Sequence, residues 1–212
     1  DDAANAVATA IKQLGGLDIL MNNAGAPAKP APFEDLSLEN FDATMAVHVR
    51  GVLAHSQHAA RHMRAQKSGS IINVGSIAGH RAGYTASMLY AVAKAAVIHM
   101  TKCAAMELGE DGVRVNCISP GVIATGIFAK AMGMDTDTAE TTVEKVKPMI
   151  AGMQAVPRAG ETDDIANAAV YLGSDEAGFV NGVDIVIDGG LIWGRRYSET
   201  SKGGGTWSTL FD

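Results

Sequence analysis

The stretch LDILMNNAG, residues 17–25, decides the fold. A short apolar run is followed directly by two asparagines, an alanine and a glycine, which is typical of a buried strand in a parallel sheet. In doubly wound sheets, ligands bind outside the carboxyl ends of the strands. Small residues at such an edge let the backbone approach a ligand closely. The stretch therefore predicts a buried strand with a binding edge immediately after it.

Three further strands alternate with helices along the chain. The strands are expected in GSIINVGS (69–76), GVRVNCISPG (112–121) and NGVDIVIDGG (181–190). LDILM, SIINV and VRVNCI are apolar on both faces, as a sheet covered twice by helices requires. Helical patterns occupy residues 3–14, 38–66, 90–109 and 161–174, with Thr162 as the N-cap of the last, and a looser Met-rich pattern occupies 128–154. Such alternation predicts an α/β fold, a doubly wound parallel sheet with helices on both faces.

The composition excludes several classes of partner. Of the 212 residues, 47% are hydrophobic and 19% are charged, with a net charge of −6, which argues against a nucleic-acid partner. No apolar run approaches the ~18 residues of a membrane span, and the acidic helix start DDAANAVATAIK does not resemble a signal peptide. Cys103 and Cys117 lie in apolar contexts. We interpret them as buried thiols of a reducing, cytoplasmic compartment, although the sequence leaves a disulfide open.

SMLYAVAKAAV, residues 87–97, places a phenol and an ammonium on one helix face. Residues four apart on a helix are neighbours, so the side chains of Tyr90 and Lys94 can converge on one point. By itself the spacing is a weak signal, because a half-buried tyrosine beside a solvated lysine would produce the same pattern. The rest of the chain has to decide between the two readings.

Four motifs, which follow one another along the chain, indicate that the pairing of Tyr90 and Lys94 is functional, because together they resemble a known family. They are NNAG at 22–25, the serine of NVGSIAG at 76, YAVAK at 90–94 and RVNCISPGVIAT at 114–125. From its first residue to about Gly190, the chain resembles the short-chain dehydrogenase/reductase family. The resemblance implies a Rossmann-like fold and hydride transfer between NAD or NADP and a secondary alcohol or ketone. It disfavours reduction of a carbon–carbon double bond, because the family's enoyl reductases space tyrosine and lysine more widely.

The resemblance also implies roles for individual residues. Tyr90 would exchange a proton with the substrate oxygen, Ser76 would hydrogen-bond that oxygen, and Lys94 would hold the nicotinamide ribose. A cation within ~4–6 Å favours a phenolate, so we expect Lys94 to lower the pKa of Tyr90 from its usual value near ~10. The cofactor would be bound by Asn23, Ala24, Gly25, Val74, Tyr90, Lys94, Pro120, Gly121, Ile123 and Thr125. The two long helices commonly form interfaces in this family, so a homo-oligomer, a tetramer or a dimer, is expected.

The chain departs from the family pattern in two places. His48 in AVHVRG stands where the family has an asparagine that helps to hold a water linked to the lysine. A histidine can also relay protons, so His48 is either a member of the catalytic set or a satisfied core residue. The family's glycine-rich turn for the diphosphate is not found upstream of NNAG, and we expect the 212 residues to be part of a longer polypeptide. An exposed edge of LDILM should accompany such a truncation.

Three further histidines follow His48 on the same helix: His55, His58 and His62. The spacing of His58 and His62 is compatible with a metal, but no third ligand is aimed at them. We expect a solvated or subunit-facing stripe and no metal site.

Residues 1–194 are expected to form a single Rossmann-like dehydrogenase domain that is N-terminally incomplete, with 126–155 as a substrate lid and 195–212 as a tail. Flexible methionines in the lid suit an adaptable apolar pocket: Met132, Met134, Met149 and Met153. His80, Arg81 and Tyr84 are candidates to face the substrate, a hydrophobic or cyclic secondary alcohol or ketone. The tail, with Trp207, Leu210 and Phe211, is either a frayed terminus or a docking arm. A non-catalytic binding or regulatory protein on the same scaffold is the alternative function.

Overall fold

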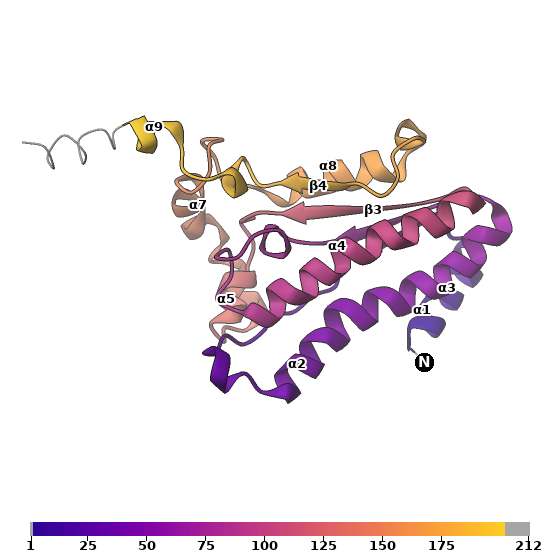
Figure 1. Cartoon of the computed structure of the whole chain (residues 1–212), viewed down its shortest axis with the longest axis horizontal. Helices are drawn as coiled ribbons and strands as arrows, with labels where there is room; N and C mark the ends of the chain where they lie inside the picture. The colour runs from indigo at the N-terminus through magenta and orange to yellow at the C-terminus, as the bar shows by residue number, and fades with distance from the viewer. Residues whose placement is uncertain (1, 202–212) are drawn as a thin grey trace, which may run out of the picture. The chain divides into compact units, whose positions relative to one another are not determined.

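The computed structural model describes residues 2–201, so the expectations for Trp207, Leu210 and Phe211 lie outside the described residues. The described chain divides into two compact units. Figure 1 shows the helices and strands with their labels. The first comprises the residues up to Pro120 together with Ile165–Val186, and the second comprises Gly121–Asp164 and the residues from Ile187 onward.

Four strands form one sheet in the order β1-β2-β3-β4, which is also their order along the chain. Their bounds are Ile19–Asn22 for β1, Gly69–Val74 for β2, Val113–Pro120 for β3 and Asp184–Ile187 for β4. β1 pairs with β2, and β2 with β3, both in parallel register. The predicted parallel α/β sheet is therefore confirmed. Because neighbouring strands run in the same direction, the segments that follow β1 and β2 start from the same edge of the sheet.

Helices cover both faces of this sheet in the first unit. On one side lie α3 (Gly51–Gln66) and α4 (Met88–Leu108), with α1 (Asp2–Leu14) packed on α3. On the other side lies the part of α8 (Thr162–Gly173) that begins at Ile165, whose Leu172 carbonyl accepts hydrogen bonds from Ser70 on β2 and Arg114 on β3. The main core joins α3, α4 and the sheet through residues that are almost fully buried: Ala59, Met63, Ile71, Ala105, Val113 and Val115. Its alanines allow the helices to approach the strands closely.

The second unit is helical and corresponds to the predicted lid. It contains α5 (Ile127–Ala131), α6 (Thr136–Glu140), α7 (Val143–Ala151) and α9 (Tyr197–Thr200). Ala124, Ile150 and Ala159 form its small core. The looser helical pattern expected over 128–154 is thus three short helices. The assignment of this segment as a lid stays a prediction.

Three boundaries differ from the sequence-based expectation. The helix expected over 38–66 is α2 (Leu38–Met45), a π-helical turn (Ala46–Arg50) and α3, so a bulge interrupts it. α8 begins at Thr162, which is its first helical residue and not its N-cap. Glu161 precedes it and donates its backbone N–H to Asp164 Oδ2 at 2.8 Å. α4 begins two residues before Tyr90, with Ser87 as its N-cap.

The first strand is also less buried than its composition predicts. Ile19 and Met21 on β1 are 49% and 38% exposed, whereas Ile71 and Ile72 on β2 are almost fully buried. β1 is the edge strand of the described sheet, so it lacks a neighbour on one side. The expected exposed edge of LDILM is therefore observed. Separately, none of the helices within residues 2–201 is both long and apolar enough to cross a membrane.

Candidate active site

Ser76 stands just beyond the carboxyl end of β2. Gly75 between them has to be a glycine, because a Cβ there would lie 2.6 Å from Ser119 Oγ. Ser76 then caps a short 3-10 helix, Ile77–Gly79, and its Oγ accepts a hydrogen bond from Ala78 N at 3.2 Å. The local sequence thus turns the chain sharply at the sheet edge and holds the serine at the start of the turn.

Tyr90 and Lys94 lie one turn apart in the first half of α4, as their spacing predicts. Ser87 Oγ accepts the backbone N–H of Tyr90 and so starts the helix directly before the pair. Lys94 is 5% exposed, and its Nζ donates to Val74 O at 2.7 Å, while it lies 5.6 Å from the centroid of the Tyr90 ring. The ammonium is therefore anchored to the end of β2 and lies over the face of the Tyr90 ring.

The 3-10 helix that follows Ser76 packs directly on this part of α4. A Cβ at Gly79 would lie 2.7 Å from the backbone carbon of Lys94 and 2.8 Å from the nitrogen of Ala95. This close approach, which only glycine permits, brings Ser76 to Tyr90, and the hydrogen bond between their side chains acts on the phenol. Ser76, Tyr90 and Lys94 thus meet at one point of the first unit.

His48 completes this group from the π-helical turn. It is 2% exposed, and its ring meets that of Tyr90 edge to face, with centroids 5.3 Å apart. Its Nε2 lies 2.9 Å from Ala26 O, which can only accept, so Nε2 carries the proton. Nδ1 is buried and has no hydrogen-bond partner among the described residues. A Cβ at Gly25 would lie 3.1 Å from His48 Cε1, which explains the glycine that ends NNAG.

Burial dominates the protonation of these groups. Desolvation raises the pKa of Tyr90, and the hydrogen bond from Ser76 opposes this by lowering it. Desolvation lowers the pKa of Lys94 to about 8. Desolvation also lowers the pKa of His48; the hydrogen bond to Ala26 raises this pKa, and the positive charge of Lys94 lowers it further. The expectation that Lys94 lowers the pKa of Tyr90 is therefore wrong for this arrangement: the ammonium is directed at Val74 O, and desolvation of the phenolate prevails.

The residues expected to bind a cofactor lie in both units. In the first, Asn23, Ala24 and Gly25 are exposed beyond β1, Val74 ends β2, and Pro120 ends β3. An ammonium has three donors, and one hydrogen bond of Lys94 is made with Val74, so the lysine is suited to hold a ligand hydroxyl as well. A cavity of about 130 Å³ opens beside His48, lined by residues of the loop after β1 and of α2, including Ala26, Pro27 and Thr44. The free donors of Lys94 suit a ribose hydroxyl, whereas none of the residues expected to bind the cofactor lines this cavity.

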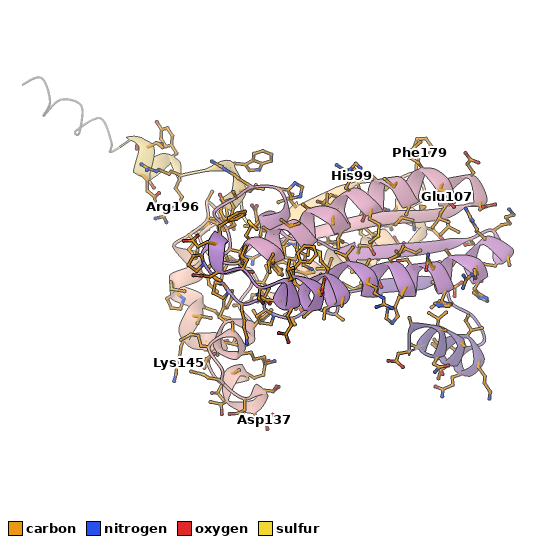
Figure 2. All side chains as sticks on the ribbon, turned by 60° about the horizontal axis from the view of Figure 1, so that its bottom comes forward. His99, Glu107, Asp137, Lys145, Phe179 and Arg196 are labelled. Atoms are coloured by element: carbon orange, nitrogen blue, oxygen red, sulfur yellow. The ribbon has the colours of Figure 1, made fainter. Side chains whose placement is uncertain are left out.

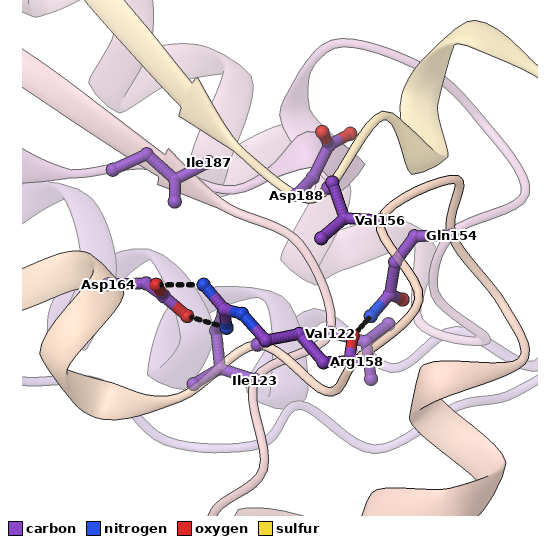
Figure 3. Close-up of a pocket in the computed structure, with 10 residues that line it drawn as sticks. Val122, Ile123, Gln154, Val156, Arg158, Asp164, Ile187 and Asp188 are labelled. Carbon is purple, nitrogen blue, oxygen red and sulfur yellow. Dashed lines mark hydrogen bonds and ion pairs between the residues drawn. The ribbon is translucent and has the colours of Figure 1, made fainter.

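Gly121, Ile123 and Thr125 belong to the second unit, and their part in a cofactor site stays a prediction. Ile123 lines a hollow of about 100 Å³ there (Figure 3). Beside it, Arg158 donates two hydrogen bonds to the carboxylate of Asp164, at 2.7 and 2.6 Å. The Arg158 guanidinium holds the pKa of Asp164 at about 2, so this pair ties the segment before α8 to the helix.

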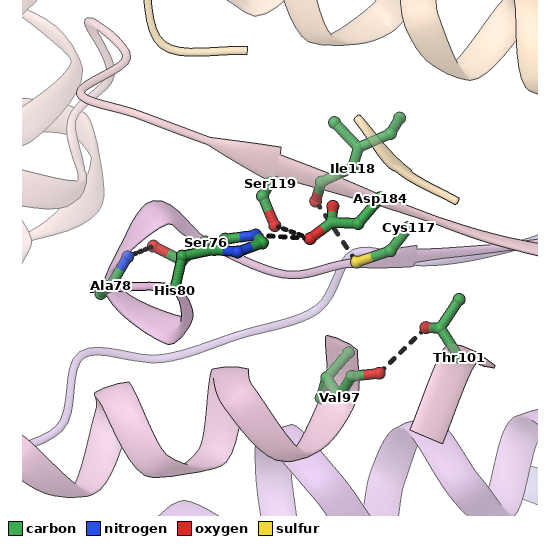
Figure 4. A network of polar contacts seen from close by, with 9 residues as sticks. All are labelled: Ser76, Ala78, His80, Val97, Thr101, Cys117, Ile118, Ser119 and Asp184. Atoms are coloured by element: carbon green, nitrogen blue, oxygen red, sulfur yellow. Dashed lines mark hydrogen bonds and ion pairs between the residues drawn. The ribbon is translucent and has the colours of Figure 1, made fainter. Parts of the chain in front are cut away.

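Sequence reasoning missed a buried polar chain beneath the site. Asn22 Nδ2 donates to Asn73 Oδ1 at 2.8 Å and lies 3.0 Å from Ser56 Oγ, and Asn73 Nδ2 donates to Thr101 Oγ1 at 2.9 Å. Thr101 in turn donates to Val97 O in α4 (Figure 4). The chain ties β1, β2, α3 and α4 together. The first asparagine of NNAG is therefore a structural residue, and no local pattern marks Asn73 and Thr101 as its partners.

Of the remaining candidate histidines, His55, His58 and His80 have other partners, whereas His62 Nε2 is buried without a hydrogen-bond partner among the described residues. His55 Nδ1 bonds Gly51 O at 2.8 Å, and Arg61 lies 3.0 Å from His58 Nδ1. Among the described residues no cluster of three or more His, Cys, Asp or Glu side chains is arranged to hold a metal ion. His80, a candidate to face the substrate, directs its Nε2 at Asp184.

The chain is similar to several known oxidoreductases. A family model described as "Enoyl-(Acyl carrier protein) reductase" matches residues 1–192. The chain is 40% identical to "(+)-borneol dehydrogenase 2" of Salvia officinalis, covering 90% of this chain and 68% of the relative. It is 34% identical to "Cis-4-hydroxycyclohexanecarboxylate dehydrogenase" of Sinomonas cyclohexanicum, covering 90% and 72%.

Two solved structures show the same fold. One is a gluconate 5-dehydrogenase from Burkholderia cenocepacia J2315 in complex with NADP and tartrate, with a TM-score of 0.77 and 30% identity over 91% of this chain and 71% of that one. The other is NAD+-bound xylitol dehydrogenase, with a TM-score of 0.76 and 28% identity over 89% and 74%. The matched model, the dehydrogenase relatives and the shared fold lead to one conclusion: the chain belongs to the short-chain dehydrogenase/reductase family of oxidoreductases.

Proposed function

We propose that the protein interconverts a hydrophobic or cyclic secondary alcohol and its ketone, with NAD or NADP as the hydride partner. The observation that carries the proposal is the meeting of Tyr90, Ser76 and Lys94 at the edge of the sheet. Relatives named for borneol and for a hydroxycyclohexane support a cyclic substrate. When bound, the nicotinamide cofactor supplies or accepts the hydride.

Tyr90 exchanges a proton with the substrate oxygen in this proposal. Its raised pKa keeps the phenol protonated at neutral pH, so it is ready to donate to a ketone oxygen. Ser76, which already bonds the phenol, orients the same oxygen. The Lys94 ammonium, with a pKa of about 8, is mostly charged at pH 7 and favours the phenolate that remains after donation.

The cofactor ribose would lie against Asn23, Ala24 and Gly25 and bond Lys94. Val74 contributes indirectly, because its carbonyl fixes the Lys94 ammonium. We also propose that the cofactor is bound by Pro120, at the end of β3, and by Gly121, Ile123 and Thr125, which belong to the second unit. The solved relatives include an NADP complex and an NAD+ complex, and we propose no preference between the two.

His48 is proposed to relay protons next to Tyr90. Its Nε2 is satisfied by Ala26 O, but its buried Nδ1 lone pair has no partner among the described residues. A buried unpaired acceptor is costly, so a satisfied core histidine fits this nitrogen poorly, whereas a relay member that binds water fits it. The lowered pKa keeps the ring neutral and leaves Nδ1 able to accept.

The same proposal covers the organisation of the chain. Residues 1–194 would act as one dehydrogenase domain, with 126–155 as the lid over the substrate. Four exposed methionines of that segment support an adaptable apolar pocket: Met132, Met134, Met149 and Met153.

We further propose a homo-oligomer, a dimer or tetramer, in the cytoplasm. Large apolar side chains exposed on α3 and α4 support the interface: Leu53, Met88, Val92 and Met106. Phe179, labelled in Figure 2, is fully exposed as well. Cys103 and Cys117 are both free; Cys117 is buried as expected, but the expected burial is wrong for Cys103, which lies on an exposed position of α4. Free thiols are compatible with a reducing compartment.

Tyr90→Phe tests the proposed function. It removes the phenolic oxygen that exchanges the proton, so turnover over a panel of cyclic alcohols and ketones should fall at least about a hundredfold, the scale of general acid catalysis. Binding of reduced cofactor, followed by nicotinamide fluorescence, should be unchanged. Tyr171→Phe, at an exposed tyrosine on α8, is the matched control. Retained turnover in Tyr90→Phe refutes the assigned role, and failure of the unmodified protein to bind cofactor favours the non-catalytic alternative.

A further inference from the structure

The segment that carries Ser76 is held at three points. At its start, Gly75 packs against Ser119 on β3, and in its middle, Gly79 packs against the backbone of α4 at Lys94. At its end, the side chain of His80 reaches Asp184, with Nε2 and Oδ2 2.6 Å apart. In the first two contacts, a glycine packs closely against a neighbouring segment without a side-chain hydrogen bond. The third is a directional side-chain bond between residues that are 104 positions apart in sequence.

Asp184 is a strong anchor for this bond. It opens β4, and its side chain is 6% exposed, so its charge requires donors from the protein. Two donors share its Oδ2: His80 Nε2 at 2.6 Å and Ser119 Oγ at 2.8 Å (Figure 4). The thiol of Cys117 also faces it, and burial together with Asp184 raises the pKa of that thiol to about 12. The carboxylate therefore sits in a site built by β3 and β4.

His80 is coupled to Ser76 through the shortest helix in the site. The 3-10 helix Ile77–Gly79 joins them, with Ser76 at its N-cap and His80 at its C-cap. Gly79 N donates to Ser76 O at 2.9 Å, and His80 N donates to Ile77 O at 3.1 Å. Because the turn is a single hydrogen-bonded unit, a displacement of His80 moves Ser76 with it.

We infer that His80 and Asp184 are a positioning pair: the bond between them fixes the 3-10 helix on the sheet and so sets the place of the Ser76 hydroxyl relative to Tyr90. The inference rests on the proposed function for the role of Ser76. His80 acts through Ser76 and does not touch the reacting atoms. Nε2 is the donor of this bond, because a carboxylate oxygen can only accept.

The test compares three variants at position 80 and its partner. His80→Ala removes the donor and should lower kcat about tenfold or more, since a misplacement of about 1 Å can cost about a hundredfold. Cofactor affinity, measured by nicotinamide fluorescence, should stay within about twofold, because Asn23–Gly25 and Lys94 keep their places. His80→Gln returns an amide N–H at similar reach and should restore most of kcat. His99→Ala, at an exposed histidine of α4 labelled in Figure 2, is the control.

If His80 had only a structural role, His80→Ala would lower stability and leave the kcat of the folded enzyme unchanged. A fall in kcat that His80→Gln restores therefore distinguishes a positioning role from a structural one. If His80→Ala does not fold, Asp184→Asn decides: it keeps the shape but weakens a charged hydrogen bond, and kcat should fall about fivefold. An unchanged kcat in the folded variant overturns the inference. Ser76→Ala is measured in parallel. Full activity of Ser76→Ala would instead refute the proposed function, whereas an inactive Ser76→Ala beside a fully active His80→Ala refutes only the positioning pair.

Discussion

Replacing Lys94 by methionine should raise stability near neutral pH while abolishing activity. The lysine is 5% exposed, and burial lowers its pKa from 10.5 to about 8. Each pKa unit corresponds to ~1.4 kcal/mol, so holding this charge in the folded protein costs about 3 kcal/mol. Methionine has a similar volume and no charge. It leaves Val74 O without its donor, which costs roughly 1–3 kcal/mol and partly offsets the gain.

The pH dependence of the stability difference between Lys94→Met and the wild type reports on the charge alone. The lost hydrogen bond to Val74 changes this difference by the same amount at every pH. The folded pKa lies below the unfolded one, so between pH 8 and pH 10.5 the unfolded chain binds more protons, and this group's contribution to stability rises with pH. The buried Lys94 charge destabilises the wild type fully below pH 8, and this destabilisation disappears above pH 10.5. The free energy of unfolding of Lys94→Met minus that of the wild type should therefore fall by about 3 kcal/mol from pH 7 to pH 10.5.

Urea unfolding at several pH values and one protein concentration measures this difference. Lys12→Met removes an exposed lysine of α1 and controls for the loss of a positive charge. A difference between Lys94→Met and wild type that stays constant within ~0.5 kcal/mol would show that burial does not strain the ammonium, and the electrostatic reasoning for the site would be wrong. The expected gain in stability with loss of activity would show that Lys94 is kept for function at a cost in stability.

Two further perturbations test the same geometry. Burial lowers the pKa of His48 from 6.5, so below pH 6.5 the unfolded chain takes up a proton that the folded protein does not. The wild type should therefore lose stability relative to His48→Asn as pH falls from 7 to 5. Thermal midpoints of the two proteins that change in parallel across this range would contradict the prediction. Gly79→Ala places a Cβ 2.7 Å from backbone of Lys94 and should destabilise the protein by about 1–3 kcal/mol and lower kcat, while Gly16→Ala, with no atom within 4 Å, should change stability by less than ~0.5 kcal/mol; equal urea midpoints for the two variants would show that the loop has room.

Local sequence determined much of this protein. The alternation of apolar runs with helical patterns predicted the parallel sheet, because hydrophobic periodicity reflects which faces must be buried. The four-residue spacing of Tyr90 and Lys94 predicted their adjacency, because helical geometry is set by the backbone alone. The serine after β2 could be assigned to the same edge, since parallel strands end on one side of a sheet.

Only the tertiary structure decided how these groups behave. The bond of Lys94 to Val74, the pair of His80 and Asp184, and the chain from Asn22 to Thr101 join segments that no local pattern connects. The direction of the Tyr90 pKa shift was wrongly expected from the nearby cation, because desolvation depends on everything that surrounds the phenol. Sequence spacing states which residues can meet, whereas burial and hydrogen-bond direction, which set their charge and position, arise only when distant segments pack together.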